Sequence, residues 1–178
     1  MAIKNSLGGI AWSEWEAPLK TRQEAALEEK RVELKEQMDF ICFSSMNLQN
    51  SGRKLKQYAN EKDIQIIGDI PIYVAFDSAD AWANPELFQF DENSTPLAVA
   101  GCPPDAFAAT GQLWGNPLYR WDYHAQTGYA WWISRLRHCF TLYDVVRVDH
   151  FRGFDEYYAI PYGDKTAENG VWKKGSGN

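Results

Sequence analysis

Two stretches rich in β-branched residues decide the fold class: IQIIGDI at residues 64–70 and DVVRVDH at residues 144–150. Each is a nearly continuous apolar run, which is typical of a strand buried on both faces within a parallel sheet. Pro71 lacks a backbone N–H, so we expect it to end pairing after the first strand. The turn formed by Phe151, Arg152 and Gly153 closes the second strand. The pattern predicts an α/β protein.

The segment between these strands is long and divides into two parts. Residues 73–128 are dense in Pro, Gly, Asn, Asp and aromatic residues, and only SADAW and PELF within them favour short helices. Residues 129–140 carry apolar side chains at helical spacing and predict a helix. Strand, long loop, helix and strand in this order indicate a β–α unit of a parallel sheet with an expanded, functional loop.

The N-terminal third of the chain favours helix. Residues 13–40 are rich in good helix formers, and Ser13 and Glu16 have the spacing of a capping box. Residues 53–61 predict a second, shorter helix. Between them, residues 44–52 fit neither helix nor strand well.

Composition excludes several classes of function. The net charge is −6 and the sequence pI is about 5.1, without a basic stripe, which argues against a nucleic-acid partner. No apolar run approaches the ~20 residues that a membrane span needs, and no signal peptide is evident. Cys42, Cys102 and Cys139 form neither a disulfide framework nor a metal signature, so we expect a reducing, cytoplasmic location.

The sharpest local feature is the sequence Arg147-Val148-Asp149-His150. On a strand, Arg147 and Asp149 point to one face, and the valines to the other. A carboxylate nucleophile must stay ionised, and an adjacent guanidinium favours its charged form. The alternative is a structural Arg–Asp ion pair at a strand end, which these four residues alone favour.

Other candidates stand at the first strand and in the long loop. Asp69 lies at the end of the first strand and could face the same side as Asp149, or bind the backbone of the following turn. The loop from Gly101 to Tyr119 contains Trp114, which offers a flat apolar ring, with Gln112 and Asn116 beside it. These are groups that a sugar ring requires. A surface loop that packs its own rings is about equally compatible with the pattern.

Three motifs together resemble one family. They are GDIPIYVAFDSADAWANPELF at 68–88, GCPPDAFAATGQLWGNPLYRW at 101–121 and VVRVDHFRGF at 145–154. They closely resemble the 4-α-glucanotransferases, the amylomaltases or disproportionating enzymes of glycoside hydrolase family 77. The similarity runs from about residue 55 to residue 172, and more weakly over residues 12–38.

The resemblance implies part of a (β/α)8 TIM barrel of the glycoside hydrolase type with a long inserted loop after one strand. Residues 1–178 would form a fragment of a single catalytic barrel domain, with residues 1–52 as a helical lead-in and 53–178 carrying the nucleophile strand. It implies transfer of an α-1,4-glucan segment to another glucan, with no metal, nucleotide or flavin. The three histidines show no metal-ligand spacing either.

The resemblance also assigns residues. Asp149 matches the nucleophile, and Arg147 matches the arginine that orients and ionises it. Asp69 matches a carboxylate at the donor sugar. Trp114, Asn116 and Asp105 match the loop that covers the glucan. His150, beside Asp149, is a further substrate-binding candidate from its position alone, and the alternative is a satisfied polar residue at the strand end.

The sequence departs from the family in two respects. The acid/base glutamate and a further aspartate are expected beyond Asn178, and neither Asp155 nor Glu156 falls in the required motif. We therefore expect a fragment that is inactive alone and poorly soluble, and that at most binds glucan; a hydrolase is the least favoured alternative. Residues 44–52 replace an expected aromatic-Gln-Trp segment, and the hypothesis is a pair of compensating frameshifts, with a divergent loop as the alternative.

Overall fold

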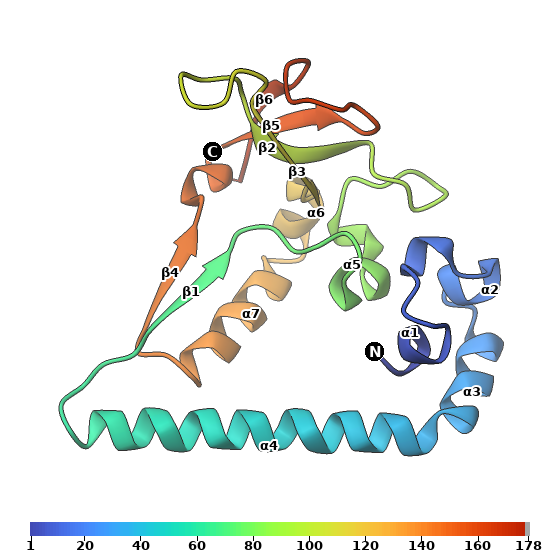
Figure 1. The fold of residues 1–178 in the computed structure, drawn as a ribbon, viewed down its shortest axis with the longest axis vertical. Helices are drawn as coiled ribbons and strands as arrows, with labels where there is room; N and C mark the ends of the chain where they lie inside the picture. The colour runs from blue at the N-terminus through green and yellow to red at the C-terminus, as the bar shows by residue number, and fades with distance from the viewer. Residues whose placement is uncertain (177–178) are drawn as a thin grey trace. The chain divides into compact units, whose positions relative to one another are not determined.

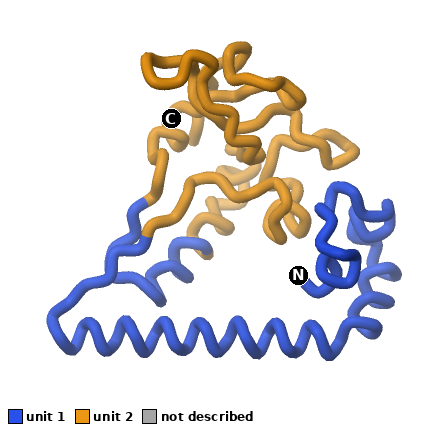
Figure 2. The backbone as a smooth tube through the Cα atoms, viewed as in Figure 1, with its two compact units in different colours: residues 1–68, 135–147 blue, residues 69–134, 148–178 orange. Residues whose placement is uncertain are grey.

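The computed structural model describes residues 1–176 and contains two compact units. The first unit combines residues 1–68 with 135–147. The second combines residues 69–134 with the chain from 148 onward. Figure 2 shows the two units in different colours. Each unit therefore joins segments that are far apart in the sequence.

The first unit begins with short helical pieces. They are α1 (Ala2–Ser6), η1 (Trp12–Glu14), α2 (Ala17–Lys20) and α3 (Glu24–Glu33), drawn in Figure 1. The single helix expected over residues 13–40 is thus wrong. The capping box is absent too, because neither η1 nor α2 has a side-chain cap. The helix is interrupted at Arg22, whose φ of 57° lies in the left-handed region.

Helix α3 has a solvated, charged surface. Arg31 forms ion pairs with Glu24 at 2.7 Å and Glu28 at 3.0 Å, while Lys30 pairs with Glu33 at 2.7 Å. These side chains are largely exposed, so each pair adds little to stability. The alternating charges of this segment therefore mark a solvated face.

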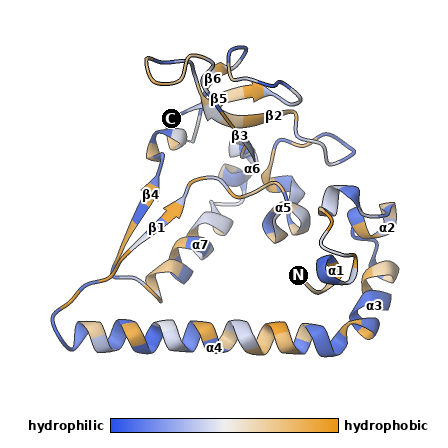
Figure 3. Cartoon of the chain, viewed as in Figure 1, coloured by the Kyte–Doolittle hydropathy of each residue, from blue (hydrophilic) through white to orange (hydrophobic). Residues whose placement is uncertain are grey.

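Helix α4 (Lys35–Asn60) runs without interruption for 26 residues. The expectation that residues 44–52 form neither helix nor strand is therefore wrong, although Gly52 costs a helix interior about 1 kcal/mol. None of its residues is buried. Figure 3 shows hydrophobic and hydrophilic residues mixed along its length. The good helix formers on both sides of residues 44–52 allow the helix to continue through this segment.

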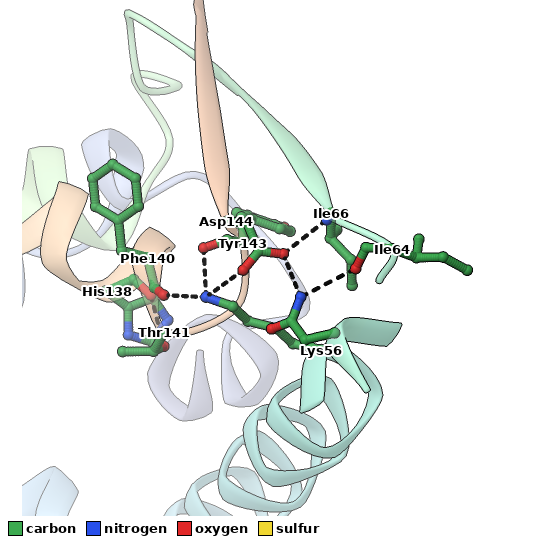
Figure 4. A network of polar contacts seen from close by, with 9 residues as sticks. Lys56, Ile64, Ile66, His138, Phe140, Thr141, Tyr143 and Asp144 are labelled. Atoms are coloured by element: carbon green, nitrogen blue, oxygen red, sulfur yellow. Dashed lines mark hydrogen bonds and ion pairs between the residues drawn. The ribbon is translucent and has the colours of Figure 1, made fainter. Parts of the chain in front are cut away.

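Asp144 anchors the end of α4 (Figure 4). Its carboxylate accepts hydrogen bonds from the Ile66 amide at 2.8 Å and from Asn60 Nδ2 at 3.0 Å. Lys56 Nζ lies 3.4 Å from Asp144 Oδ1 and donates to the carbonyl oxygens of Phe140 and Tyr143. The bond from the Ile66 amide, followed by that from Asn60, lowers the pKa of Asp144. This network fixes the start of both neighbouring strands.

Strands β1 (Ile67–Pro71) and β4 (Val145–Asp149) are hydrogen-bonded neighbours in a two-stranded sheet. Their arrows point the same way in Figure 1, and α7 (Ala130–Phe140) precedes β4 as predicted. Full burial of both strands was expected and is not found. Ile67 is 69% exposed and Val145 45% exposed, because two strands alone cannot cover both faces of the sheet.

The second unit contains a four-stranded antiparallel sheet of order β3-β2-β5-β6. Its strands are β2 (Ala98–Cys102), β3 (Gln112–Pro117), β5 (Glu156–Pro161) and β6 (Val171–Lys174). Residues 73–128 are therefore not a continuous loop. Gly101 permits the tight pairing, since a Cβ there would lie 2.1 Å from the Gln112 carbonyl oxygen.

Aromatic rings fill the core of the second unit. Tyr119 is buried, and its ring contacts those of Phe88, His124, Trp131 and Trp132. The short helices α5 (Ala79–Ala83) and η2 (Pro85–Leu87), both predicted, and α6 (Trp121–Gln126) surround this core. Most of the aromatic residues in this unit are thus structural. Within residues 1–176, no helix is long and apolar enough to cross a membrane.

Candidate active site

Asp149 is the last residue of β4, and Arg147 precedes it by two positions. The burial of β4 alternates: Arg147 and Asp149 are exposed, while Val146 and Val148 are half-buried. A strand places alternate side chains on opposite faces, which produces this pattern. Arg147 and Asp149 therefore share the exposed face of β4.

Asp69 lies on the neighbouring strand β1, at its third position. It does not end the strand, as the sequence suggested, because pairing continues to Pro71. Its side chain is exposed, like that of Asp149. Two adjacent strands of the sheet thus each present an exposed aspartate.

Trp114 and Asn116 lie on β3 rather than in a loop. Gln112 and Trp114 share one face of β3, but the register shift of this hairpin and the positive φ of Gly115 interrupt the alternation before Asn116. The Trp114 indole N–H donates to Gln112 Oε1 at 3.0 Å, and Asn116 Nδ2 donates to the Val74 carbonyl at 2.8 Å. The second bond ties the hairpin of β2 and β3 to the segment that follows β1.

Asp105 shapes the connection between β2 and β3. Its Oδ1 accepts hydrogen bonds from the amides of Phe107 at 2.8 Å and Ala108 at 2.7 Å. An aspartate that binds the backbone two residues on forms an Asx-turn. The geometry therefore gives Asp105 a structural contact in addition to the sugar contact expected from the resemblance.

His150 lies between Asp149 and the short helix η3 (Phe151–Phe154). Its backbone is left-handed, with φ 52° and ψ 44°. Its ring meets the Trp114 indole edge-to-face, with 4.8 Å between centroids and 86° between planes. Burial lowers the pKa of His150, while the Asp149 charge raises it and Arg152 lowers it further. At neutral pH the imidazole is therefore uncharged.

Tyr73 completes this part of the site, and sequence reasoning missed it. It is 6% exposed, and its ring lies 6.3 Å from that of Trp114 and 6.5 Å from that of His150. Its ring also stacks on Tyr119 at 5.9 Å. Burial raises the pKa of Tyr73. Its position directly after the first strand was the available signal.

The structure thus brings two of the candidate residues together, since the rings of Trp114 and His150 meet beside Tyr73, and Asn116 bonds the carbonyl of the following residue, Val74. Asp69 and Asp149 lie on adjacent strands, and Asp105 lies in the hairpin connection. An exposed carboxylate next to a partly exposed indole and side-chain amides could hold and attack a sugar ring. Within residues 1–176, no three His, Cys, Asp or Glu side chains gather as a metal site.

Sequence comparison connects this geometry to known proteins. The 4-alpha-glucanotransferase family matches residues 1–178. A 4-alpha-glucanotransferase of Clostridium butyricum is 48% identical over 98% of this chain, and one of Streptococcus pneumoniae is 49% identical over 99%. A chloroplastic/amyloplastic relative from Solanum tuberosum is 45% identical over 99% of the chain.

Structural comparison agrees. The amylomaltase from Streptococcus agalactiae, solved in complex with acarbose, superposes with a TM-score of 0.95 at 44% identity over 98% of this chain. The amylomaltase from Corynebacterium glutamicum shares the fold, with a TM-score of 0.63 at 23% identity over 71% of the chain.

This chain spans only about a third of its relatives: 36% of the Clostridium protein, 35% of the Streptococcus pneumoniae protein and 36% of the Streptococcus agalactiae structure. The match nevertheless extends over its whole length, through both strands and the hairpin that carry the candidate residues. The chain belongs to the 4-alpha-glucanotransferase family.

Proposed function

We propose that this chain supplies the nucleophile, Asp149, of a retaining α-1,4-glucan transferase. In this proposal β1 and β4 are neighbouring strands of a partial (β/α)8 barrel, and the antiparallel sheet forms the insertion beside its active-site end. The observation that carries the proposal is the exposed carboxylate at the last position of β4, directly before His150, whose ring contacts that of Trp114.

The proposed reaction has two displacements. The Asp149 carboxylate attacks the anomeric carbon of the donor glucan, and the bond from this carbon to the glycosidic oxygen breaks. The departing oxygen takes a proton from an acid carboxyl, which the resemblance places outside residues 1–178. A hydroxyl of the acceptor glucan then attacks the glucosyl ester and returns a proton to that carboxyl, and Asp149 is released.

Each neighbouring residue has a role in this proposal. Arg147 keeps the Asp149 carboxylate ionised and oriented, since a guanidinium favours the charged form. Asp69 binds hydroxyls of the donor sugar. Trp114 offers its ring to a sugar face, and Asn116 and Asp105 hold the hairpin that presents this ring.

A graft tests the catalytic role. Residues 1–178 replace the matching segment of the Clostridium butyricum relative, and transfer from maltotriose is followed as glucose and longer oligosaccharides. We expect the graft to be active and Asp149→Asn to reduce kcat by about 10⁴-fold or more, as loss of a nucleophile does. Asp155→Asn, which removes another exposed carboxylate six residues away, is the matched control. Equal loss in both variants, or a folded but inactive graft, contradicts the proposal.

The second candidate function is glucan binding without turnover, favoured by the partly exposed Trp114 side chain. The isolated chain, incubated with maltotriose, should leave the oligosaccharide lengths unchanged. Calorimetric titration with acarbose should still detect weak binding that Trp114→Ala removes. Redistribution of chain lengths by the isolated chain would show that residues 1–178 suffice for transfer.

A further inference from the structure

Three features around His150 are left unexplained by a nucleophile and its arginine. His150 adopts a left-handed backbone, its Nε2 atom is buried without a hydrogen-bond partner, and its ring abuts Trp114. A left-handed conformation costs a residue with a Cβ roughly 1–2 kcal/mol, and glycine would avoid this cost. The imidazole itself is therefore the feature to explain.

The backbone around His150 fixes the position of its ring. Gly153 packs so closely that a Cβ there would lie 2.8 Å from Ile72 Cδ1 and 3.1 Å from the Tyr73 hydroxyl. This close approach holds η3 against the segment that follows β1. Tyr73 is held in turn by stacking on Tyr119, whose hydroxyl donates to the Ile72 carbonyl at 2.7 Å. His150 thus rests on a rigid support.

Trp114 has weaker support from its own strand. Its ring is 36% exposed, and its indole N–H bonds only to Gln112, whose side chain is itself exposed. The Tyr73 and His150 rings supply the remaining contacts. Edge-to-face aromatic pairs contribute about 0.5–1.5 kcal/mol beyond burial and set ring orientation.

We infer that His150 is a positioning residue, which sets the orientation of the Trp114 ring that the proposed function offers to the glucan. The inference rests on the proposed function for its glucan part alone. The contact between His150 and Trp114 requires no ligand. It links the end of β4 to the β3 hairpin, so that the position of the Trp114 ring is fixed relative to the residue that follows Asp149.

The charge state of His150 provides a readout. Burial lowers its pKa, and two charged groups act on it: the Asp149 carboxylate raises the pKa and the Arg152 guanidinium lowers it. The Tyr73 phenol, which lies beside the imidazole, is neutral at these pH values. Because its pKa is lowered, the imidazole is neutral at pH 7 and gains its charge below the ordinary value of about 6.5. Protonation then places a charge against the Trp114 ring.

Fluorine NMR of the chain labelled with 5-fluorotryptophan tests the positioning role without glucan. Trp114→Phe assigns the Trp114 resonance. We expect this resonance to move with pH, with a midpoint below 6.5, and His150→Gln to abolish the movement and displace the resonance at pH 7. His150→Phe should restore its position without restoring pH dependence. His138→Gln, which changes an exposed histidine of the other unit, is the control. The inference is overturned if the chemical shift of the Trp114 resonance changes neither with pH nor in the His150→Gln variant.

Kinetics of the graft test the glucan part. We expect His150→Gln to raise KM for maltotriose about tenfold while kcat changes less than threefold, and His150→Phe to recover part of the loss. A lost kcat with unchanged KM would make His150 part of the chemistry and overturn the positioning role. If the NMR experiment gives the expected pH dependence and its loss in His150→Gln, but no variant binds glucan, the proposed function is refuted. The positioning contact between His150 and Trp114 is then still supported.

Discussion

Asp149 lies at the point where the backbone changes direction abruptly. It is the last extended residue of β4, and the next residue is left-handed. A side chain on a strand end is held by the ladder behind it, which gives it a more precise aim than a loop provides. The same position leaves the carboxylate exposed, as the proposed role of nucleophile for a large substrate requires.

Arg147 offers a direct test of how this carboxylate is held. In the graft, we expect Arg147→Ala to lower kcat/KM by about 10- to 100-fold, because one hydrogen bond between charged groups contributes roughly 1.5–3 kcal/mol. Arg147→Lys should recover little of this loss, since an ammonium lacks the planar fork of the guanidinium. The measurement is maltotriose disproportionation at several substrate concentrations.

A control on the same chain separates charge from position. Arg152→Ala removes a guanidinium that pairs with Glu156 and lies over the Trp172 ring. Activity that falls equally in both arginine variants would mean that overall charge, rather than the place of Arg147 on β4, supports the reaction.

Helix α4 shows what a local sequence pattern fails to predict. Residues 44–52 contain Ser, Asn and Gly, which lower helix propensity, and yet the helix continues through them. A groove of about 790 Å³ runs beside this segment, lined by Cys42, Ser45 and Gly52 on α4 and by His138 and Leu142. Small side chains on the helix leave this groove open.

The genetic code sharpens the frameshift hypothesis for this segment. In the frame that joins the third base of each codon to the first two of the next, the codons of Met46 and Asn47 must read glutamate. Where Ser51 is encoded by AGT or AGC, the same frame reads glutamine at 51, or a stop, and then tryptophan or arginine at 52. The hypothesis therefore requires Asn47→Glu, Ser51→Gln and Gly52→Trp together. A nucleotide sequence whose shifted frame meets a stop codon here rules it out.

Gly52→Trp alone has a structural consequence. A Cβ at this position would meet only Leu142 Cδ2, at 2.9 Å, which is the end of a flexible side chain. The indole can then enter the groove, and burial of a large apolar side chain contributes about 1.5–3 kcal/mol. We expect a higher denaturant midpoint in the variant. Gly52→Ala is the control, since it removes only the glycine cost of about 1 kcal/mol. Equal midpoints in both variants would mean that the groove is not filled.

At the scale of the whole molecule, exposed apolar surface is the main liability. On α4, Phe43 is 58% exposed and Leu48 76% exposed, and on β1 Ile67 is 69% exposed. Apolar patches and unpaired strand edges both promote association. The free chain carries these surfaces uncovered within the described residues.

We therefore expect the chain to associate as its concentration rises, measured by light scattering and by binding of the dye ANS. Phe43→Glu with Leu48→Glu should reduce both signals, whereas Asn47→Glu, which adds a charge to the same helix without removing apolar surface, should reduce them little. A monomer that melts in one sharp transition and binds no dye would contradict this expectation.

The sequence predicts some levels of this structure well and others poorly. The two strands of β-branched residues, helix α7 and the short helices near residues 79–87 were expected, because each has a strong local period. The antiparallel sheet was missed because β2 and β3 both contain glycine, β3 ends in proline, and β2 pairs with β5, some 60 residues away in the sequence. Long-range pairing leaves little local signal.

The candidate site follows the same division. Asp149 and Arg147 could be placed by alternation along one strand, and the resemblance supplied their roles. Tyr73 was missed, since its place after the first strand is a weak signal and its importance comes from rings that are distant in sequence, Trp114 and His150. The left-handed backbone of His150 is equally invisible in the sequence, because the neighbouring turn imposes it.

The anchoring of α4 by Asp144 has a consequence for synthesis of the chain. Asn60 and Asp144 are 84 residues apart, so the contact has to wait for the later segment. At about 5–20 residues per second, the ribosome needs roughly 4 to 17 seconds to supply it. Throughout this interval α4 has left or is leaving the ribosome without its partner, and its apolar side chains are open to chaperones. The vulnerable period of this protein is therefore set by translation speed before it is set by stability.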